Sequence, residues 1–312
     1  MKTADSQAHQ DPLVVQYLDV LQKQRNLSPH TISNYQLDLR DLDAFANGKE
    51  LASLTYFDLR RLTSQRHAQG LSARSISRKL SCWRGFYRWL ADQTTLAANP
   101  VDGIKAPKKE KSLPKALGAD DAVRLVSQKT SNEPTPCVNR AMFELLYSSG
   151  LRVSELVGLD VADINENGYT SLGWVDINQA EVRVTGKGNK QRIVPVGKPA
   201  LVAISEWLLL RPMLLKTDDR PLFLTERGTR MSVRLVQLRL KAHAQTIGIP
   251  ADVHPHVLRH SFASHVLQSS GDLRAVQEML GHSSIAATQV YTSLDFQHLA
   301  KVYDASHPRA KK

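Results

Sequence analysis

Residues 254–265 read H-P-H-V-L-R-H-S-F-A-S-H, and the chain continues with L-G-H-S-S at 280–284 and Q-V-Y-T at 289–292. Pro255 suits the first turn of a helix, so His256 lies where free backbone N–H groups favour an anion. Arg259 follows one turn later on the same face, with His260 beside it. His282 and then Tyr291 follow, and a tyrosine hydroxyl can attack phosphorus only where the developing charge is stabilised. The stretch therefore predicts phosphate chemistry.

A zinc site is the alternative reading of the four histidines in the first of these segments: His254, His256, His260 and His265. Few carboxylates and no cysteine lie nearby, and Arg259 would place a fixed positive charge beside the cation. His265 has apolar neighbours on its helix face, which favours a packing role. We therefore expect no metal ion and no other cofactor at this site.

Length and charge narrow the class of protein. The 312 residues predict two domains, and the net charge of +11 favours a polyanionic partner. Cys82 and Cys137 form no metal or redox motif, which fits a reducing compartment. The chain begins with a polar segment, and no apolar run reaches membrane length. A soluble, cytoplasmic protein is expected.

The first part of the chain predicts a compact four-helix domain over residues 8–94. Helix starts are signalled by Asp11 with Pro12, Ser28 with Pro29, Thr55 with Asp58, and Ser72. Apolar residues recur at helical spacing after each start. A proline-containing basic linker is expected at 95–114.

Positive charge gathers in the second half of this domain. Between residues 60 and 91 there are eight arginines and lysines and no acidic residue. A merely solvated helix would mix signs because like charges repel, so contact with DNA phosphates is favoured over a role in solubility. The candidate DNA-binding residues are Arg74, Arg78, Lys79, Arg84 and Arg88.

Residues 115–304 predict a second, mainly α-helical domain with a small β-sheet, followed by a basic tail at 305–312. G-L-R-V-S-E-L at 150–156 places Arg152 just past a helix stop, with Glu155 three residues on. E-V-R-V-T-G-K-G-N-K-Q-R-I-V-P-V at 181–196 predicts two strands about a glycine-rich turn with Lys187 at its tip. A lysine flanked by glycines suits a proton donor, and it equally suits a plain surface turn.

Together these motifs resemble the phage-integrase family of tyrosine recombinases, over nearly the whole chain. Six positions match the family's Arg, Lys, His, Arg, His and Tyr in order: Arg152, Lys187, His256, Arg259, His282 and Tyr291. The first domain is similar to the family's core-binding domain. The resemblance implies a helical core-binding domain and an α/β catalytic domain that form a clamp around DNA.

The resemblance also implies a reaction. Tyr291 would be the nucleophile, leaving a 3′-phosphotyrosyl link, and Lys187 would protonate the departing oxygen. Arg152 and Arg259 would bind the phosphate charge together with His256 and His282, while His256 accepts the tyrosine proton. Glu155 and His260 would support the site. Neither ATP nor a metal would be needed.

The last residues, 294–312, are similar to the tail of the XerC subfamily. That resemblance implies XerD as partner recombinase in a heterotetramer, a dif-like DNA site and FtsK as activator, hence chromosome-dimer resolution during cell division. The run Leu294, Leu299, Val302 and Tyr303 could dock on a neighbouring subunit. One departure is the segment Ile164 to Ala180, which is longer than the family pattern.

Other functions stay open at this point. A mobile-element integrase would use the same residues, and a type IB topoisomerase would use similar chemistry without site specificity. A non-catalytic DNA-binding protein would not require all six positions. A metal-dependent nuclease would be inhibited by a chelator.

Overall fold

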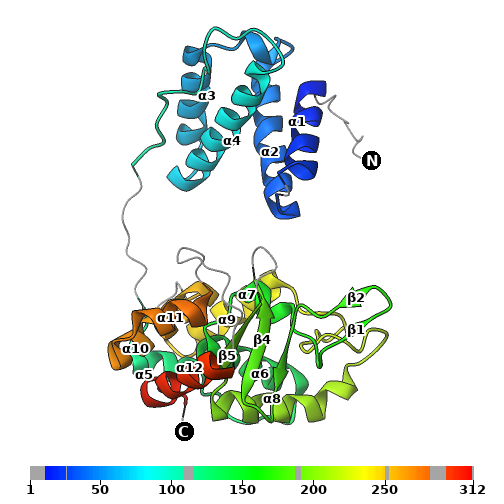
Figure 1. The fold of residues 1–312 in the computed structure, drawn as a ribbon, viewed down its shortest axis with the longest axis vertical. Coiled ribbons are helices and arrows are strands. Elements are labelled where there is room, and N and C mark those ends of the chain that lie inside the picture. Colours follow the sequence, from blue (N-terminus) through cyan, green and yellow to red (C-terminus); the bar gives the residue numbers. More distant parts are fainter. Residues whose placement is uncertain are drawn as a thin grey trace. The chain divides into compact units, whose positions relative to one another are not determined.

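A computed structural model describes residues 11–25, 27–108, 116–186, 191–249, 253–281 and 293–310. The chain divides into two compact units, 1–112 and 113–312, each with its own hydrophobic core. Most of the described residues are helical, as the sequence predicts (Figure 1). No helix in the described ranges combines the length and apolar character needed to cross a membrane.

The first unit contains the four predicted helices: α1 (Pro12–Lys23), α2 (Pro29–Ala46), α3 (Tyr56–Ala68) and α4 (Ala73–Ala91), with a short 3-10 helix η1 (Leu51–Ser53). Each predicted cap is present. Asp11, Ser28 and Ser72 accept hydrogen bonds from backbone N–H groups of their helices, and Thr55 forms a capping box with Asp58. Such caps satisfy N–H groups that have no partner within the helix.

α4 contributes more buried residues to the core of the first unit than any other helix does. Its buried aromatic side chains include Trp83, which donates to the Asp38 carbonyl at 2.8 Å, and Tyr87, which donates to the Leu51 carbonyl at 2.9 Å. α4 therefore has one face in the core, and of its basic side chains only Lys79 is buried with that face.

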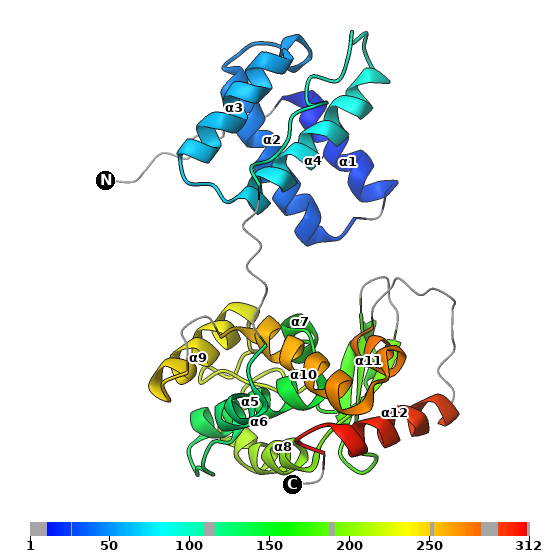
Figure 2. The same cartoon turned by 90° about the vertical axis from the view of Figure 1, so that its left-hand side faces the viewer.

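The second unit is built around α6 (Pro134–Ser149), most of whose residues are buried. The other elements are α5 (Ala119–Val126), α7 (Val153–Val157), α8 (Lys198–Leu210), η2 (Arg211–Met213), α9 (Val233–Thr246), α10 (Pro255–Ser270), α11 (Leu273–Leu280) and α12 (Ser293–Ser306). α8 and α10 pack against α6, and α12 packs against α10 and the sheet (Figure 2).

The predicted strand pair is confirmed as β4 (Glu181–Thr185) and β5 (Gln191–Pro195), which are antiparallel with Val184 opposite Arg192. A third strand, β3 (Gly173–Asp176), adds to β4 and makes a three-stranded sheet. The sheet packs its inward valines onto the common core of the domain.

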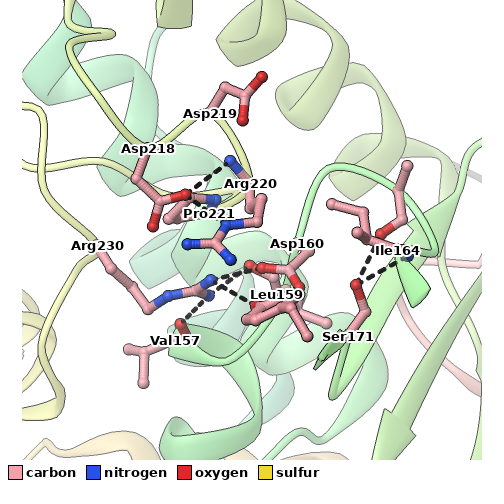
Figure 3. A network of polar contacts seen from close by, with 12 residues as sticks. Val157, Leu159, Asp160, Ile164, Ser171, Asp218, Asp219, Arg220, Pro221 and Arg230 are labelled. Carbon is pink, nitrogen blue, oxygen red and sulfur yellow. Dashed lines mark hydrogen bonds and ion pairs between the residues drawn. The ribbon is translucent and has the colours of Figure 1, made fainter. Parts of the chain in front are cut away.

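The long segment before the strand pair forms an additional hairpin of β1 (Asn165–Glu166) and β2 (Tyr169–Thr170). An ion-pair network around the buried Asp160 ties it to the domain, and Figure 3 shows Asp160 with Arg230, Arg220 and Asp218. Asp160, fully buried, accepts a hydrogen bond from Tyr169 at 2.7 Å and from Arg230 at 2.5 Å. Arg220 lies over the Tyr169 ring at 4.2 Å and pairs with Asp218. The extra residues are therefore anchored to the body of the domain.

The end of the chain also belongs to the second unit. Residues 305–310 were expected in a basic tail, but His307 and Arg309 are buried, and Arg309 pairs with the fully buried Glu144. Leu299 and Tyr303, expected to dock on a neighbouring subunit, are buried in this chain's own core. In this structure α12 therefore covers its own domain.

Candidate active site

Arg152 lies two residues after the glycine that ends α6. α6 ends at Gly150, whose φ of 55° is left-handed, and a Cβ there would lie 2.4 Å from the Phe262 ring, so only glycine fits. Arg152 then caps α7. Its backbone N–H and its Nη1 donate to the two carboxylate oxygens of Glu155, at 2.8 and 2.7 Å. Glu155 thus orients the Arg152 guanidinium.

Arg259, in the second turn of α10, is only 7% exposed. Its Nη1 donates to the Gly150 carbonyl at 2.6 Å and its Nη2 to the Leu280 carbonyl at 2.5 Å. Burial, together with the charges of Arg152 and Arg192, lowers the pKa of Arg259 to about 10. The guanidinium stays protonated at neutral pH and is fixed between the ends of α6 and α11.

Arg192 completes this cluster of arginines, and the sequence analysis did not single it out. Its Nη1 and Nη2 donate to the two Glu155 oxygens, both at 2.8 Å, and its Nε donates to the Met279 carbonyl at 2.8 Å. The register of the predicted strand pair is the signal that could have identified Arg192. Arg192 lies opposite the buried Val184, so its side chain points to the inward face of the strand pair.

His254 and His256 lie at the start of α10. His254 is the N-cap and His256 the second helical residue; both are exposed, and their rings meet edge to face with centroids 6.2 Å apart. His260 is also exposed. Among the residues that the structure describes, no three or more His, Cys, Asp or Glu side chains are grouped as metal ligands would be. The geometry of the described residues in this region therefore gives no support for a zinc site.

His265 is a packing residue, as expected. Its Nδ1 meets the Tyr147 hydroxyl and its Nε2 meets the Leu117 carbonyl, both at 2.9 Å. Burial lowers its pKa, which favours the neutral imidazole. That prediction is confirmed.

Three of the six predicted catalytic positions, Lys187, His282 and Tyr291, lie outside the described residues. The other three are Arg152, His256 and Arg259, and the last two share α10. Arg152 and Arg259 meet at the end of α11, because Arg152 Nη2 lies 3.4 Å from the Gly281 carbonyl, next to the carbonyl that Arg259 binds. The structure thus gathers the two arginines immediately before His282.

The candidate DNA-binding residues of α4 fall into two groups: Arg74 and Arg88 are exposed, whereas Arg78, Lys79 and Arg84 have partners. Arg78 and Lys79 both pair with Asp38, a fully buried carboxylate of α2. Lys79 is itself buried, so its charge is neutralised inside the domain. Within the described part of the chain Arg74 and Arg88 form no ion pair, and their charges face solvent.

Comparison with known families agrees with this architecture. The pattern of the phage integrase family matches residues 115–298, and that of its N-terminal SAM-like domain matches residues 14–94. The chain belongs to the phage integrase family. The predicted family is thereby confirmed.

Relatives within the family carry specific names. Tyrosine recombinase XerC 1 of Ralstonia nicotianae is 54% identical over 99% of this chain and 97% of its own length. Tyrosine recombinase XerC of Alcanivorax borkumensis is 47% identical, over 99% and 98%. The predicted enzyme class, a tyrosine-type site-specific DNA recombinase, is confirmed.

Two solved structures of integrase-type proteins show the same fold. XerH recombinase bound to palindromic difH substrate matches with a TM-score of 0.63 at 22% identity, covering 93% of this chain and 84% of that one. A lambda integrase dimer bound to a COC′ core site matches with a TM-score of 0.66 at 17% identity, covering 90% and 98%. The predicted fold class is confirmed.

The ion pairs of Glu155 in this phage-integrase domain predict a pH dependence of stability. Burial alone would raise the pKa of Glu155, but hydrogen bonds and charge from Arg192, then Arg152, outweigh it and lower the pKa to about 2. The ionised carboxylate therefore stabilises the fold fully above the unfolded-state pKa of 4.5, and this stabilisation is lost as pH falls toward 2. It amounts to about 3 kcal/mol.

Urea unfolding of wild type and Glu155→Gln at several pH values tests this. The difference in free energy of unfolding between them is expected to shrink as pH falls from 5 to 2, by up to about 3 kcal/mol. Glu226→Gln, at a carboxylate that is 67% exposed, is the control and should show a nearly constant difference. A constant difference for Glu155→Gln as well would contradict the prediction.

Proposed function

We propose that this recombinase cuts and rejoins DNA through a 3′-phosphotyrosyl intermediate on Tyr291. The observation that carries the proposal is the placement of Arg152 and Arg259. Fixed backbone and carboxylate partners hold both guanidiniums at the end of the helix that leads into His282. Two preorganised cations at one point are suited to bind the charge of a phosphate in its transition state.

In the proposed cleavage step the Tyr291 oxygen forms a bond to phosphorus, and the bond from phosphorus to the 5′-oxygen breaks. Negative charge gathers on the non-bridging oxygens, where Arg152, Arg259 and His282 donate hydrogen bonds. Because the phosphotyrosine bond conserves the energy of the phosphodiester, a 5′-hydroxyl of another strand can reverse the step. Strand exchange then needs no ATP.

Two protons move in this step. His256 accepts the proton of Tyr291, and Lys187 gives one to the departing 5′-oxygen. The exposed ring of His256 at the start of α10 is accessible to a substrate from solvent, which supports its role. Glu155 orients Arg152, and the exposed His260 lies beside Arg259 as a supporting residue.

We infer that the substrate is double-stranded DNA, because structural neighbours include a recombinase and an integrase bound to their DNA sites. The two units would clamp the duplex, with Arg74 and Arg88 of α4 as phosphate contacts. The XerC names of the relatives further support a dif-like site, XerD as partner in a heterotetramer and FtsK as activator. The protein would then act in the cytoplasm, resolving chromosome dimers during cell division.

A nicked suicide duplex with a dif-like site tests the proposal, incubated in EDTA with the purified chain, alone and with XerD. A protein–DNA adduct that survives denaturing electrophoresis is expected, because the nicked strand leaves and the phosphotyrosine is trapped. DNA binding without an adduct would reduce the function to DNA binding. Cleavage only after metal is restored would indicate a nuclease, and equal attack on unrelated sequences would indicate a topoisomerase-like enzyme.

A further inference from the structure

The carboxyl end of α11 is bound by three arginines that come from three other elements. The last carbonyls of a helix have no partner within it, so they accept hydrogen bonds from outside. Arg192 of β5 donates to the Met279 carbonyl at 2.8 Å. Arg259 of α10 donates to Leu280, and Arg152 to Gly281. Three successive carbonyls are thus held immediately before His282.

Arg192 differs from the other two arginines in being closed off from any substrate. Its side chain is 4% exposed, and Nε, Nη1 and Nη2 all donate hydrogen bonds inside the protein. Two of these bonds go to Glu155, whose oxygens also accept from Arg152. Through Glu155 and the Met279 carbonyl, this guanidinium links α7 to α11, and it does so without reaching solvent.

Gly281 adds a steric contact to the hydrogen bonds. It ends α11 in the left-handed conformation with φ 63°, and a Cβ there would lie 3.0 Å from Cδ of Arg192. The stem of Arg192 therefore packs against the residue that precedes His282. Any change in the length or shape of this side chain alters the surface on which that residue rests.

We propose that Arg192 is a positioning residue for strand cleavage, one that places Arg152 through Glu155 and places the chain entering His282 through the end of α11. The inference rests on the function proposed above, in which Arg152 and His282 act on the phosphate. Arg192 itself never touches DNA. Its loss should slow the chemical step while leaving DNA affinity almost unchanged, because displacing catalytic groups by about 1 Å costs about 100-fold in rate.

A purely structural role, in which Arg192 only neutralises a buried carboxylate, makes a different prediction. Glu155 is 8% exposed, and apart from Arg192 the charged groups that face it are Arg152 and Arg259. Replacing both members of a buried ion pair by apolar residues is often neutral for stability. The hydrogen bond to Met279 does not involve Glu155, so it would still be missing in such a double variant.

The test uses three variants of the full chain: Arg192→Lys, Arg192→Met and the double variant Arg192→Met with Glu155→Met. For each, the single-turnover rate of adduct formation, the dissociation constant for the same duplex and the midpoint of urea unfolding are measured. Arg211→Met is the matched control, because Arg211 is also buried and, among the described residues, its hydrogen bonds go to the carbonyls of Asp219 and Pro221.

Arg192→Lys keeps the positive charge beside Glu155 but loses the three-way geometry of the guanidinium. It should therefore regain stability relative to Arg192→Met and yet cleave about 100-fold more slowly than wild type, with unchanged DNA affinity. The double variant should recover stability but still cleave slowly, because the hydrogen bond to Met279 and the orientation of Arg152 by Glu155 are both missing. Arg211→Met should cleave at the wild-type rate under conditions where it is folded.

Wild-type cleavage by Arg192→Lys, or full recovery in the double variant, would overturn the inference. A parallel loss of DNA affinity would also overturn it, because it would make Arg192 a binding determinant. These outcomes leave the proposed function intact as long as Tyr291→Phe forms no adduct. An adduct in Tyr291→Phe would instead remove the proposed function itself.

Discussion

Tyr291→Phe is expected to abolish the covalent adduct while leaving DNA binding intact. The variant lacks only the hydroxyl oxygen that would bond to phosphorus, so no slower version of the same step is available to it. Adduct formation on the nicked duplex should fall below detection, at least about 10⁴-fold, and the dissociation constant should stay close to that of wild type.

Tyr303→Phe is the matched control for this experiment, because it removes a hydroxyl from another tyrosine near the end of the chain. Tyr303 is 1% exposed and its hydroxyl lies 2.8 Å from Oγ of Ser148. Burial raises its pKa, so its hydroxyl is poorly suited to become a nucleophile. Adduct formation should persist in Tyr303→Phe. Loss of the adduct in Tyr303→Phe, with retention in Tyr291→Phe, would show that Tyr291 is not the nucleophile.

Arg259→Lys is expected to reduce the cleavage rate by about 10²–10³-fold, the usual effect of removing one preorganised donor to the transition state. The guanidinium binds the carbonyls of Gly150 and Leu280 at fixed angles, which a single ammonium group cannot reproduce. At least one buried carbonyl then lacks a partner, so the free energy of unfolding should also fall by about 1–3 kcal/mol. Single-turnover cleavage and urea unfolding measure the two effects.

Arg274→Lys on α11 is the control for this exchange. Arg274 is 72% exposed and, within the described ranges, pairs with Glu278 one turn away alone, so its replacement by lysine should change neither rate nor stability appreciably. Equal rates for Arg259→Lys and Arg274→Lys would mean that charge alone at residue 259 suffices. The proposed role of the guanidinium geometry would then be wrong.

The helices and the strand pair could be predicted because their signals are local. Caps such as Thr55 with Asp58 lie within four residues of one another, and the segment between β4 and β5 carries its own glycines. Membership of the phage integrase family could also be predicted, because the family's motifs occur in the same order along the sequence. The packing role of His265 followed from its apolar helix face.

Charged side chains were the least predictable part of the protein. Lys79 was expected at the DNA surface, yet it is buried against Asp38 and Asp41. Arg309 was expected in a basic tail, yet it is paired with Glu144 in the core. The sequence does not show whether a basic side chain will pair with a carboxylate from a distant segment. That pairing decides whether the charge is buried or faces solvent.

The sequence by itself predicted most of the helices, the strand pair, the family and a set of candidate catalytic residues. Only the tertiary structure decided that Arg192, Arg259 and Arg152 converge on three successive carbonyls of α11, across separations of 87, 21 and 129 residues. The physical reason is that these bonds form between the end of one helix and side chains of other elements. No periodicity encodes such contacts, and only the packing of the common core brings their partners within reach.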